Sequence, residues 1–123
     1  MPLTDTPNAP NNNGVTPIHC AAINGHFEIV RLLMSSTDTP NAPANTGVTP
    51  IHCAARYGHF EIVRLLMLST ENPNAPDNFG QTPLMDAEQK GHQVIVNLLN
   101  AHNVTLPALQ INQLDISSND IPT

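Results

Sequence analysis

Six histidines and two cysteines are the side chains of this sequence that could bind a metal ion or act as nucleophiles. Two adjacent pairs, His19-Cys20 and His52-Cys53, contain both cysteines. Zinc sites use spacings such as Cys-x-x-Cys and His-x-x-x-His, and the sequence contains neither. On a helix, adjacent side chains diverge by about 100°, so each pair points in two directions rather than at one ion. We predict no metal site and interpret the histidines as structural.

Nucleophilic catalysis is disfavoured by the same geometry. A cysteine nucleophile needs a histidine within hydrogen-bonding reach, a third residue that orients the histidine, and a group that stabilises the oxyanion. The sequence offers no such set and has no glycine-rich phosphate-binding loop. We therefore expect a non-enzymatic chain without a cofactor. A catalytic role is kept as a third alternative, which a change in thermal stability with a metal or small molecule would reveal.

The charge balance narrows the classes of partner. Four basic residues stand against ten acidic ones, for a net charge of −6. Because the basic residues form no cluster, the sequence argues against binding to nucleic acid or to anionic membranes. No apolar run approaches the ~20 residues of a membrane span, and the polar, proline-rich start is unlike a signal peptide. We expect a protein partner.

The elements that position these residues follow from an internal repeat. Residues 14–43 and 47–76 align with 25 identities in 30 positions, and a looser copy starts at Gly80. The period is 33 residues, and residues 3–10 match the end of the first copy at the same offset. We therefore expect the chain to begin at the tail of an earlier unit and to come from a longer array.

Each unit predicts two helices joined by a turn and followed by a loop. Thr16 can cap a helix that Pro17 begins, and Gly25 can end that helix with a positive φ. Residues 27–34 predict a second, largely apolar helix, and the loop after it contains prolines and a glycine. One unit has too few apolar side chains to fold alone, so the units must stack as a solenoid.

The 33-residue period with the motif TPIHCAA resembles the ankyrin repeat, whose signature is T-P-L-H-x-A. The resemblance spans residues 4–102. It implies an all-α ankyrin-repeat solenoid of stacked helix-turn-helix units, with loops that project as β-turn fingers. It also implies that His19 and His52 are structural, their rings bonding the neighbouring turn and the capping threonine.

The repeat boundaries divide the chain into five segments. We assign residues 1–10 to the loop end of a preceding repeat, 11–43 and 44–76 to two ankyrin repeats, 77–103 to a cap-like C-terminal repeat, and 104–123 to a tail. In the third repeat Met85, Asp86 and Glu88 replace the histidine, the cysteine and the second alanine. A polar first helix suits a last repeat, on which nothing stacks.

The tail contains a second, shorter pattern. Residues 111–121 fit the leucine-rich-repeat pattern L-x-x-L-x-L-x-x-N-x-L. One hypothesis is that the parent protein continues into leucine-rich repeats. The alternative is a chance match, because the apolar positions of the pattern accept several residue types.

Five positions differ between the near-identical copies, and two of them lie together at the end of the first helix, as Ile23-Asn24 in the first copy and Arg56-Tyr57 in the second. In ankyrin-like proteins these positions face the concave groove beside the finger tips, and Tyr and Arg are enriched in binding hot spots. We predict a protein-binding face made of Asn13, Val15, Ile23, Asn24, Thr46, Val48, Arg56, Tyr57, Phe79, Gln81, Gln89 and Lys90. The alternatives are drift at solvated positions and, for the whole chain, a structural spacer within a longer array.

Two loop asparagines are candidate modification sites. Asn41 and Asn74 match the asparagine that a 2-oxoglutarate dioxygenase hydroxylates in many ankyrin-like proteins. Pro40 and Pro73 precede them, where valine is usual. The alternative is that each asparagine only closes its turn.

The two cysteines occupy equivalent repeat positions. Stacking would hold their Cα atoms about 8–10 Å apart, beyond the ~7 Å reach of a disulfide. Two free thiols indicate a reducing compartment, so we expect the chain in the cytoplasm or nucleus.

The N-terminal end predicts a second kind of contact. Only the loop of the preceding repeat is present there, which leaves parts of Phe27, Ile29 and Leu33 uncovered. An exposed apolar end favours end-to-end self-association.

Overall fold

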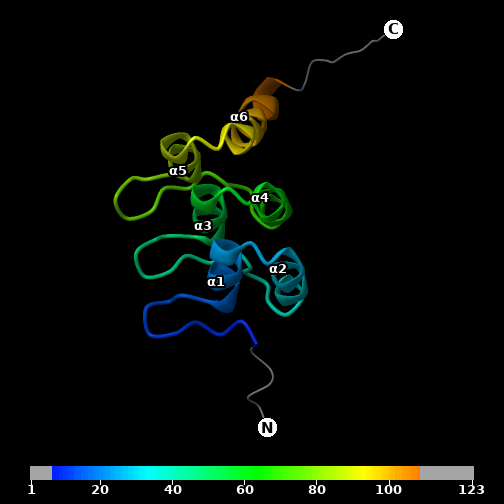
Figure 1. Cartoon of the computed structure of the whole chain (residues 1–123), viewed down its shortest axis with the longest axis vertical. Helices are drawn as coiled ribbons and strands as arrows, with labels where there is room; N and C mark the ends of the chain where they lie inside the picture. The colour runs from blue at the N-terminus through cyan, green and yellow to red at the C-terminus, as the bar shows by residue number, and fades with distance from the viewer. Residues whose placement is uncertain (1–6, 109–123) are drawn as a thin grey trace, which may run out of the picture.

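The structure, a computed structural model, describes residues 7–108. Within this range the chain forms six helices and no strands: α1 (Pro17–Asn24), α2 (Phe27–Met34), α3 (Pro50–Tyr57), α4 (Phe60–Met67), α5 (Pro83–Lys90) and α6 (Gln93–Ala108). Three consecutive helix pairs stack along one axis, which confirms the predicted all-α repeat solenoid (Figure 1). The leucine-rich pattern of the tail lies outside the described residues.

The helices are arranged in two rows. α1, α3 and α5 stack on one another, and α2, α4 and α6 stack beside them (Figure 1). The loops before α1, α3 and α5 project from the first row, away from the second row. Each loop ends in a turn in which the N–H of Gly14, Gly47 or Gly80 donates to the carbonyl three residues earlier, at 2.9, 2.8 and 3.1 Å. We call these turns finger 1 (residues 11–14), finger 2 (44–47) and finger 3 (77–80).

The first helix of each repeat begins and ends as its sequence predicts. Thr16 is the N-cap of α1, and its hydroxyl accepts the N–H of His19 at 3.2 Å. Pro17 follows at the first helical position, where its missing N–H costs nothing. Gly25 ends the helix in the left-handed region, with φ 78°. The same cap and the same terminal glycine recur in α3 and α5.

The buried histidines tie each repeat to the next finger. The backbone N–H of Thr16 donates to Nδ1 of His19 at 3.0 Å, so Nδ1 is unprotonated and Nε2 donates to the carbonyl of Val48 at 2.8 Å. His52 makes the same contacts, with Gln81 at 2.8 Å. The structural role implied for both histidines is therefore confirmed.

The second helices end without glycine. The residues after α2 and α4, Ser35 and Leu68, keep right-handed φ values of −77° and −70°. Serine hydroxyls satisfy the last carbonyls instead, since Ser36 and Ser69 each donate at 2.7 Å to a carbonyl three residues earlier. A helix can thus end here without the usual left-handed residue.

The core lies between the two rows. Small residues in the first row, among them Ala22, Ala54 and Ala87, are fully buried and let helices of adjacent repeats approach closely. Large aliphatic residues of the second row, such as Leu66 and Leu99, fill the space between the rows. The apolar cluster is continuous from the first repeat to the third, so the described residues form one folding unit.

The third repeat departs from the other two at its last helix. α6 has 16 residues where α2 and α4 have 8, so it continues past the boundary predicted at residue 103. Asp86 also differs from expectation, because it faces the second repeat and is only 1% exposed. Glu88 is exposed and makes the outer face of α5 polar, whereas Asp86 is buried and does not contribute to that face.

Candidate functional site

An apolar hollow of about 230 Å³ opens at the junction of the first and second repeats, between the fingers and the first row of helices. It is lined by Val15, His19, Ile23, Ala44, Thr46, Val48, His52, Cys53, Arg56 and Tyr57. Six of the predicted binding residues line it: Val15, Ile23, Thr46, Val48, Arg56 and Tyr57. The structure therefore brings half of the predicted face to one place.

The walls of the hollow are formed by residues of both the first and the second repeat. Val15 and Ile23 belong to the first repeat and are half-buried. Tyr57 comes from the end of α3 and is 52% exposed, with its ring beside the hollow. Histidines held by their hydrogen bonds form part of the wall, so the hollow is set by the stacking of the repeats.

The second junction carries a polar network in the corresponding position. The Arg56 guanidinium donates to Oδ1 of Asp86 at 3.2 Å, and the Gln81 side-chain amide donates to the same oxygen at 3.0 Å. Oδ2 of Asp86 is buried and has no hydrogen-bond partner among the described residues. Arg56 is 42% exposed. Its guanidinium therefore pairs with Asp86 while the side chain also lines the hollow and remains open to solvent.

Sequence reasoning missed this network, although the repeat register contains the signal. Asp86 occupies the position of Cys20 and Cys53, and that position faces the preceding repeat. A charged residue there is buried wherever a preceding repeat is present, and it then requires a partner. Arg56, which lies three residues after Cys53 in the preceding repeat, is that partner.

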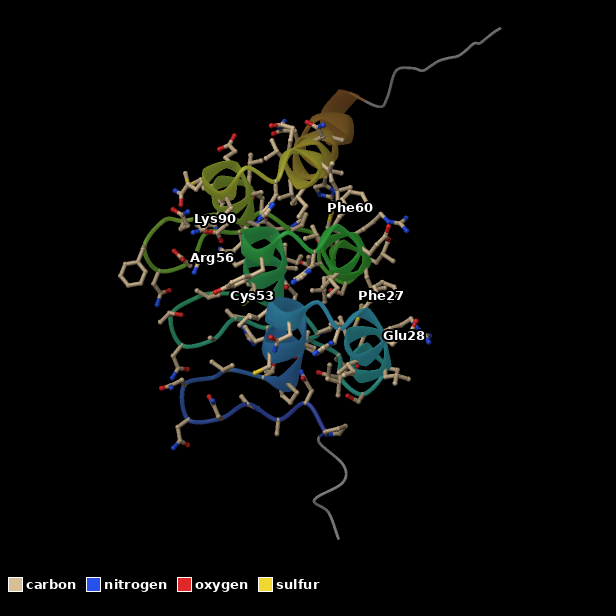
Figure 2. The ribbon with its side chains drawn as sticks, viewed as in Figure 1. Phe27, Glu28, Cys53, Arg56, Phe60 and Lys90 are labelled. Carbon is tan, nitrogen blue, oxygen red and sulfur yellow. The ribbon has the colours of Figure 1, made fainter. Side chains whose placement is uncertain are left out.

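The other predicted binding residues lie apart from the hollow. Asn24 is at the N-terminal end of the stack, and its side chain donates to the Cys20 carbonyl at 2.9 Å. Phe79 is 84% exposed in finger 3. Lys90 ends α5 on the finger side of the stack (Figure 2). The remaining residues of the prediction are Asn13 in finger 1, Gln81 beside Asp86, and Gln89 at the end of α5.

The basic side chains divide between the two rows. Arg31 and Arg64, on α2 and α4, pair with a glutamate three residues earlier on the same helix. Arg56 and Lys90 belong to the first row, which carries the fingers, whereas Glu28 and Phe60 lie on the second row (Figure 2). Arg56 and Lys90, which do not pair with an acidic residue of their own helix, therefore both lie on the row of helices that carries the fingers.

Loop asparagines use their side chains inside the fold. Oδ1 of Asn41 accepts the Ile51 N–H at 3.0 Å, and Oδ1 of Asn74 accepts the Leu84 N–H at 2.9 Å. Asn8, in the loop before the first repeat, makes the same contact with the Ile18 N–H at 3.0 Å. These bonds support the structural alternative for Asn41 and Asn74, and hydroxylation of either residue stays a prediction.

The two thiols have different environments. Cys20 is exposed at the N-terminal end of the stack, whereas Cys53 is 8% exposed, and neither forms a disulfide. Burial raises the pKa of the Cys53 thiol to about 11, so this thiol stays protonated and unreactive at neutral pH. In the described part of the chain, no three His, Cys, Asp or Glu residues gather closely enough to hold a metal ion.

The fold and the histidine contacts define a class of protein, a solenoid of stacked helix-turn-helix repeats with projecting turns. A family model described as ankyrin repeats (3 copies) matches residues 3–77 and 39–112. The chain belongs to the ankyrin repeat family. No curated protein matches it. Among residues 7–108, no helix has both the length and the apolar character needed to cross a membrane.

Proposed function

We propose that the chain is a non-enzymatic protein-interaction module that binds a segment of a partner protein in the hollow at the junction of the first and second repeats. Ankyrin repeats are generally protein-interaction modules. The observation that carries the proposal is the hollow itself, because it gathers six residues from two repeats around an opening of about 230 Å³.

The size and lining of the hollow indicate what it binds. Pockets for drug-sized ligands usually have volumes of about 300–1,000 Å³. The smaller hollow suits one side chain of a partner better than a separate small molecule. Apolar walls from Ile23 and Val48, together with Tyr57, which also lines the hollow, favour an aliphatic or aromatic side chain. The exposed part of Arg56 favours a hydrogen-bond acceptor or carboxylate beside that side chain.

The alternative function, a structural spacer, has one observation in its favour. Arg56 pairs with the buried Asp86, so its difference from Ile23 has a reason inside the fold and requires no partner. Tyr57 has no comparable internal contact and is 52% exposed. Tyr57 therefore separates the two functions better than Arg56 does.

The test is a pull-down from cell lysate with three forms of the chain. Tyr57→Asn installs the residue found at the same position of the first repeat, so the repeat sequence itself shows that the fold accepts it. Leu68→Ala is the matched control, because Leu68 is also an exposed apolar residue and lies away from the groove. Proteins captured by the wild type and by Leu68→Ala, and lost with Tyr57→Asn, would identify the partner. Identical captures by all three forms would support the spacer.

A further inference from the structure

The repeats are joined by a set of contacts that recurs at each junction. The His59 ring donates from Nε2 to the carbonyl of Ile23 at 3.0 Å and lies against Gly25. A Cβ added at Gly25 would come within 2.6 Å of the ring, so the glycine makes room for the histidine. At the next junction His92 repeats both contacts, with the Arg56 carbonyl at 3.1 Å and with Gly58.

The fingers are joined in the same repetitive way. The Asn45 side-chain amide donates to the Asn12 carbonyl at 3.1 Å, and its backbone N–H donates to the Asn13 carbonyl at 2.9 Å. Asn78 makes the equivalent two bonds to finger 2, at 3.0 and 2.9 Å. Apart from the bonds that His19 and His52 donate to the next finger, each junction therefore has a donor side, formed by a histidine and an asparagine of the later repeat, and an acceptor side, formed by carbonyls and glycines of the earlier repeat.

The first repeat presents a complete donor side that no described residue covers. Ile29 is 47% exposed, whereas the equivalent Ile62 and Ile95 are 2% and 1% exposed inside the stack. Cys20 is exposed while its equivalent, Cys53, is buried. This face borders an open hollow of about 650 Å³, whose lining includes His26, Ile29 and Cys20 and contains no acidic or basic residue other than His26. We call it the N-face.

The third repeat presents the acceptor side. Gly91 has φ 78° and Gly80 has φ 81°, and a Cβ added at either would meet nothing within 4 Å among the described residues. The other four glycines would each place a Cβ within 3 Å of a neighbouring repeat. Gln89 occupies the same repeat position as Ile23 and Arg56. The carbonyls of those two residues accept hydrogen bonds from His59 and His92 at the inner junctions. We call this surface the C-face.

We propose that the N-face of one copy of this chain binds the C-face of a second copy, in a head-to-tail stack. His26 of one copy donates to the Gln89 carbonyl of the other and packs on its Gly91, and Asn12 bonds finger 3. The two faces differ from each other, so the contact is heterologous and can continue to longer stacks. This proposal uses the ends of the solenoid and does not depend on the groove function.

Two substitutions in the C-face make the contact weaker than the inner junctions. Met85, 42% exposed, stands where His19 and His52 reach the next finger, and Gln93 stands where Phe27 and Phe60 are found. In the contact between two copies, the carbonyls and glycines of the C-face can still accept the histidine and the asparagine. The substitutions at Met85 and Gln93 remove one histidine contact and one aromatic contact. The association is therefore reversible and dependent on concentration. Because each copy carries a net charge of −6, added salt should strengthen it by screening repulsion.

The experiment measures mass in solution by sedimentation velocity, with one block for each face. A bulky maleimide on Cys20 blocks the N-face, since Cys20 is exposed and Cys53 is buried. Gly91→Asn blocks the C-face, because asparagine tolerates positive φ and its side chain occupies the space needed by His26. Met85→Arg is a second C-face block, for use if circular dichroism shows that Gly91→Asn does not fold. Leu68→Ala is the control for an exposed apolar residue elsewhere.

The unmodified chain and Leu68→Ala should increase in mass with concentration, and each block should lower the association constant by about tenfold or more. An equal mixture of the two blocked forms retains one intact junction, so it should form a heterodimer and nothing larger. A chain that is monomeric at every concentration and salt would overturn the proposal. So would self-association that persists in both blocked forms, or a mixture of them that stays monomeric.

Discussion

Arg56 and Asp86 join the second and third repeats through a bond of 3.2 Å in which one partner is exposed and the other is not. Asp86 is 1% exposed on its side chain, and Arg56 is 42% exposed. The carboxylate depends on the guanidinium much more than the guanidinium depends on the carboxylate, because water can solvate only Arg56. This asymmetry gives the first prediction.

Arg56→Ala should lower the free energy of unfolding by about 1–3 kcal/mol, because it leaves the Asp86 carboxylate buried with one fewer donor. Asp86→Cys, which restores the residue of the other repeats, should change stability by less than about 1 kcal/mol in either direction. Urea denaturation of both variants and of the double variant measures the difference. An Asp86→Cys chain that is as unstable as Arg56→Ala would refute the asymmetry.

The His19 contacts predict a dependence of stability on pH. Burial lowers the pKa of the His19 imidazole below 6.5, and the bond to Val48 offsets this shift only in part. Below pH 6.5 the unfolded chain takes up a proton that the folded chain resists, so the free energy of unfolding falls as the pH drops from 6.5 toward the folded pKa. Above pH 6.5 this contribution to stability is fully present.

Urea midpoints measured from neutral to mildly acidic pH test this prediction. His19→Met is the matched variant, since the third repeat has methionine at the equivalent position. It should be less stable at neutral pH and should lose less stability on acidification than the wild type. Equal losses in the two proteins would mean that other histidines produce the effect.

The two thiols should react at very different rates. Cys20 is exposed, whereas Cys53 is buried and has a pKa of about 11. A brief treatment of dilute protein with N-ethylmaleimide should therefore label Cys20 alone, because the thiolate is the reactive form. Mass spectrometry of the digested protein assigns the site. A Cys20→Ser chain should take up label only after urea is added, and rapid labelling of native Cys20→Ser would contradict the burial of Cys53.

Loop asparagines should contribute to stability through one hydrogen bond each. Asn74→Ala removes the acceptor for the Leu84 N–H and should cost about 1–3 kcal/mol of unfolding free energy. Asn72 lies in the same loop and is exposed, so Asn72→Ala should change stability by less than about 0.5 kcal/mol. Thermal or urea unfolding of both variants makes the comparison. Equal effects would show that the side chain of Asn74 has no special part in closing the loop.

Local structure could be predicted from the sequence because its causes are local. Thr16, Pro17 and Gly25 lie within one short helix, and capping, proline placement and positive φ act over a few residues. The period of 33 residues then placed the same helix in each copy. The role of His19 followed from the family signature, in which threonine and histidine are three residues apart.

The sequence alone determined the bounds of α1 and α2 and of their copies α3 and α4, the repeat and the family, whereas the tertiary structure decided which faces are covered and how far α6 extends. Ile29 and Ile62 occupy identical local sequences, yet one is 47% exposed and the other 2%, because among residues 7–108 a repeat packs on that side of the second repeat and none packs on that side of the first. Asp86 is buried for the same reason. The hollow beside Tyr57 likewise exists only where two repeats meet. Burial depends on residues a full period away, and no local pattern records whether that neighbour is present.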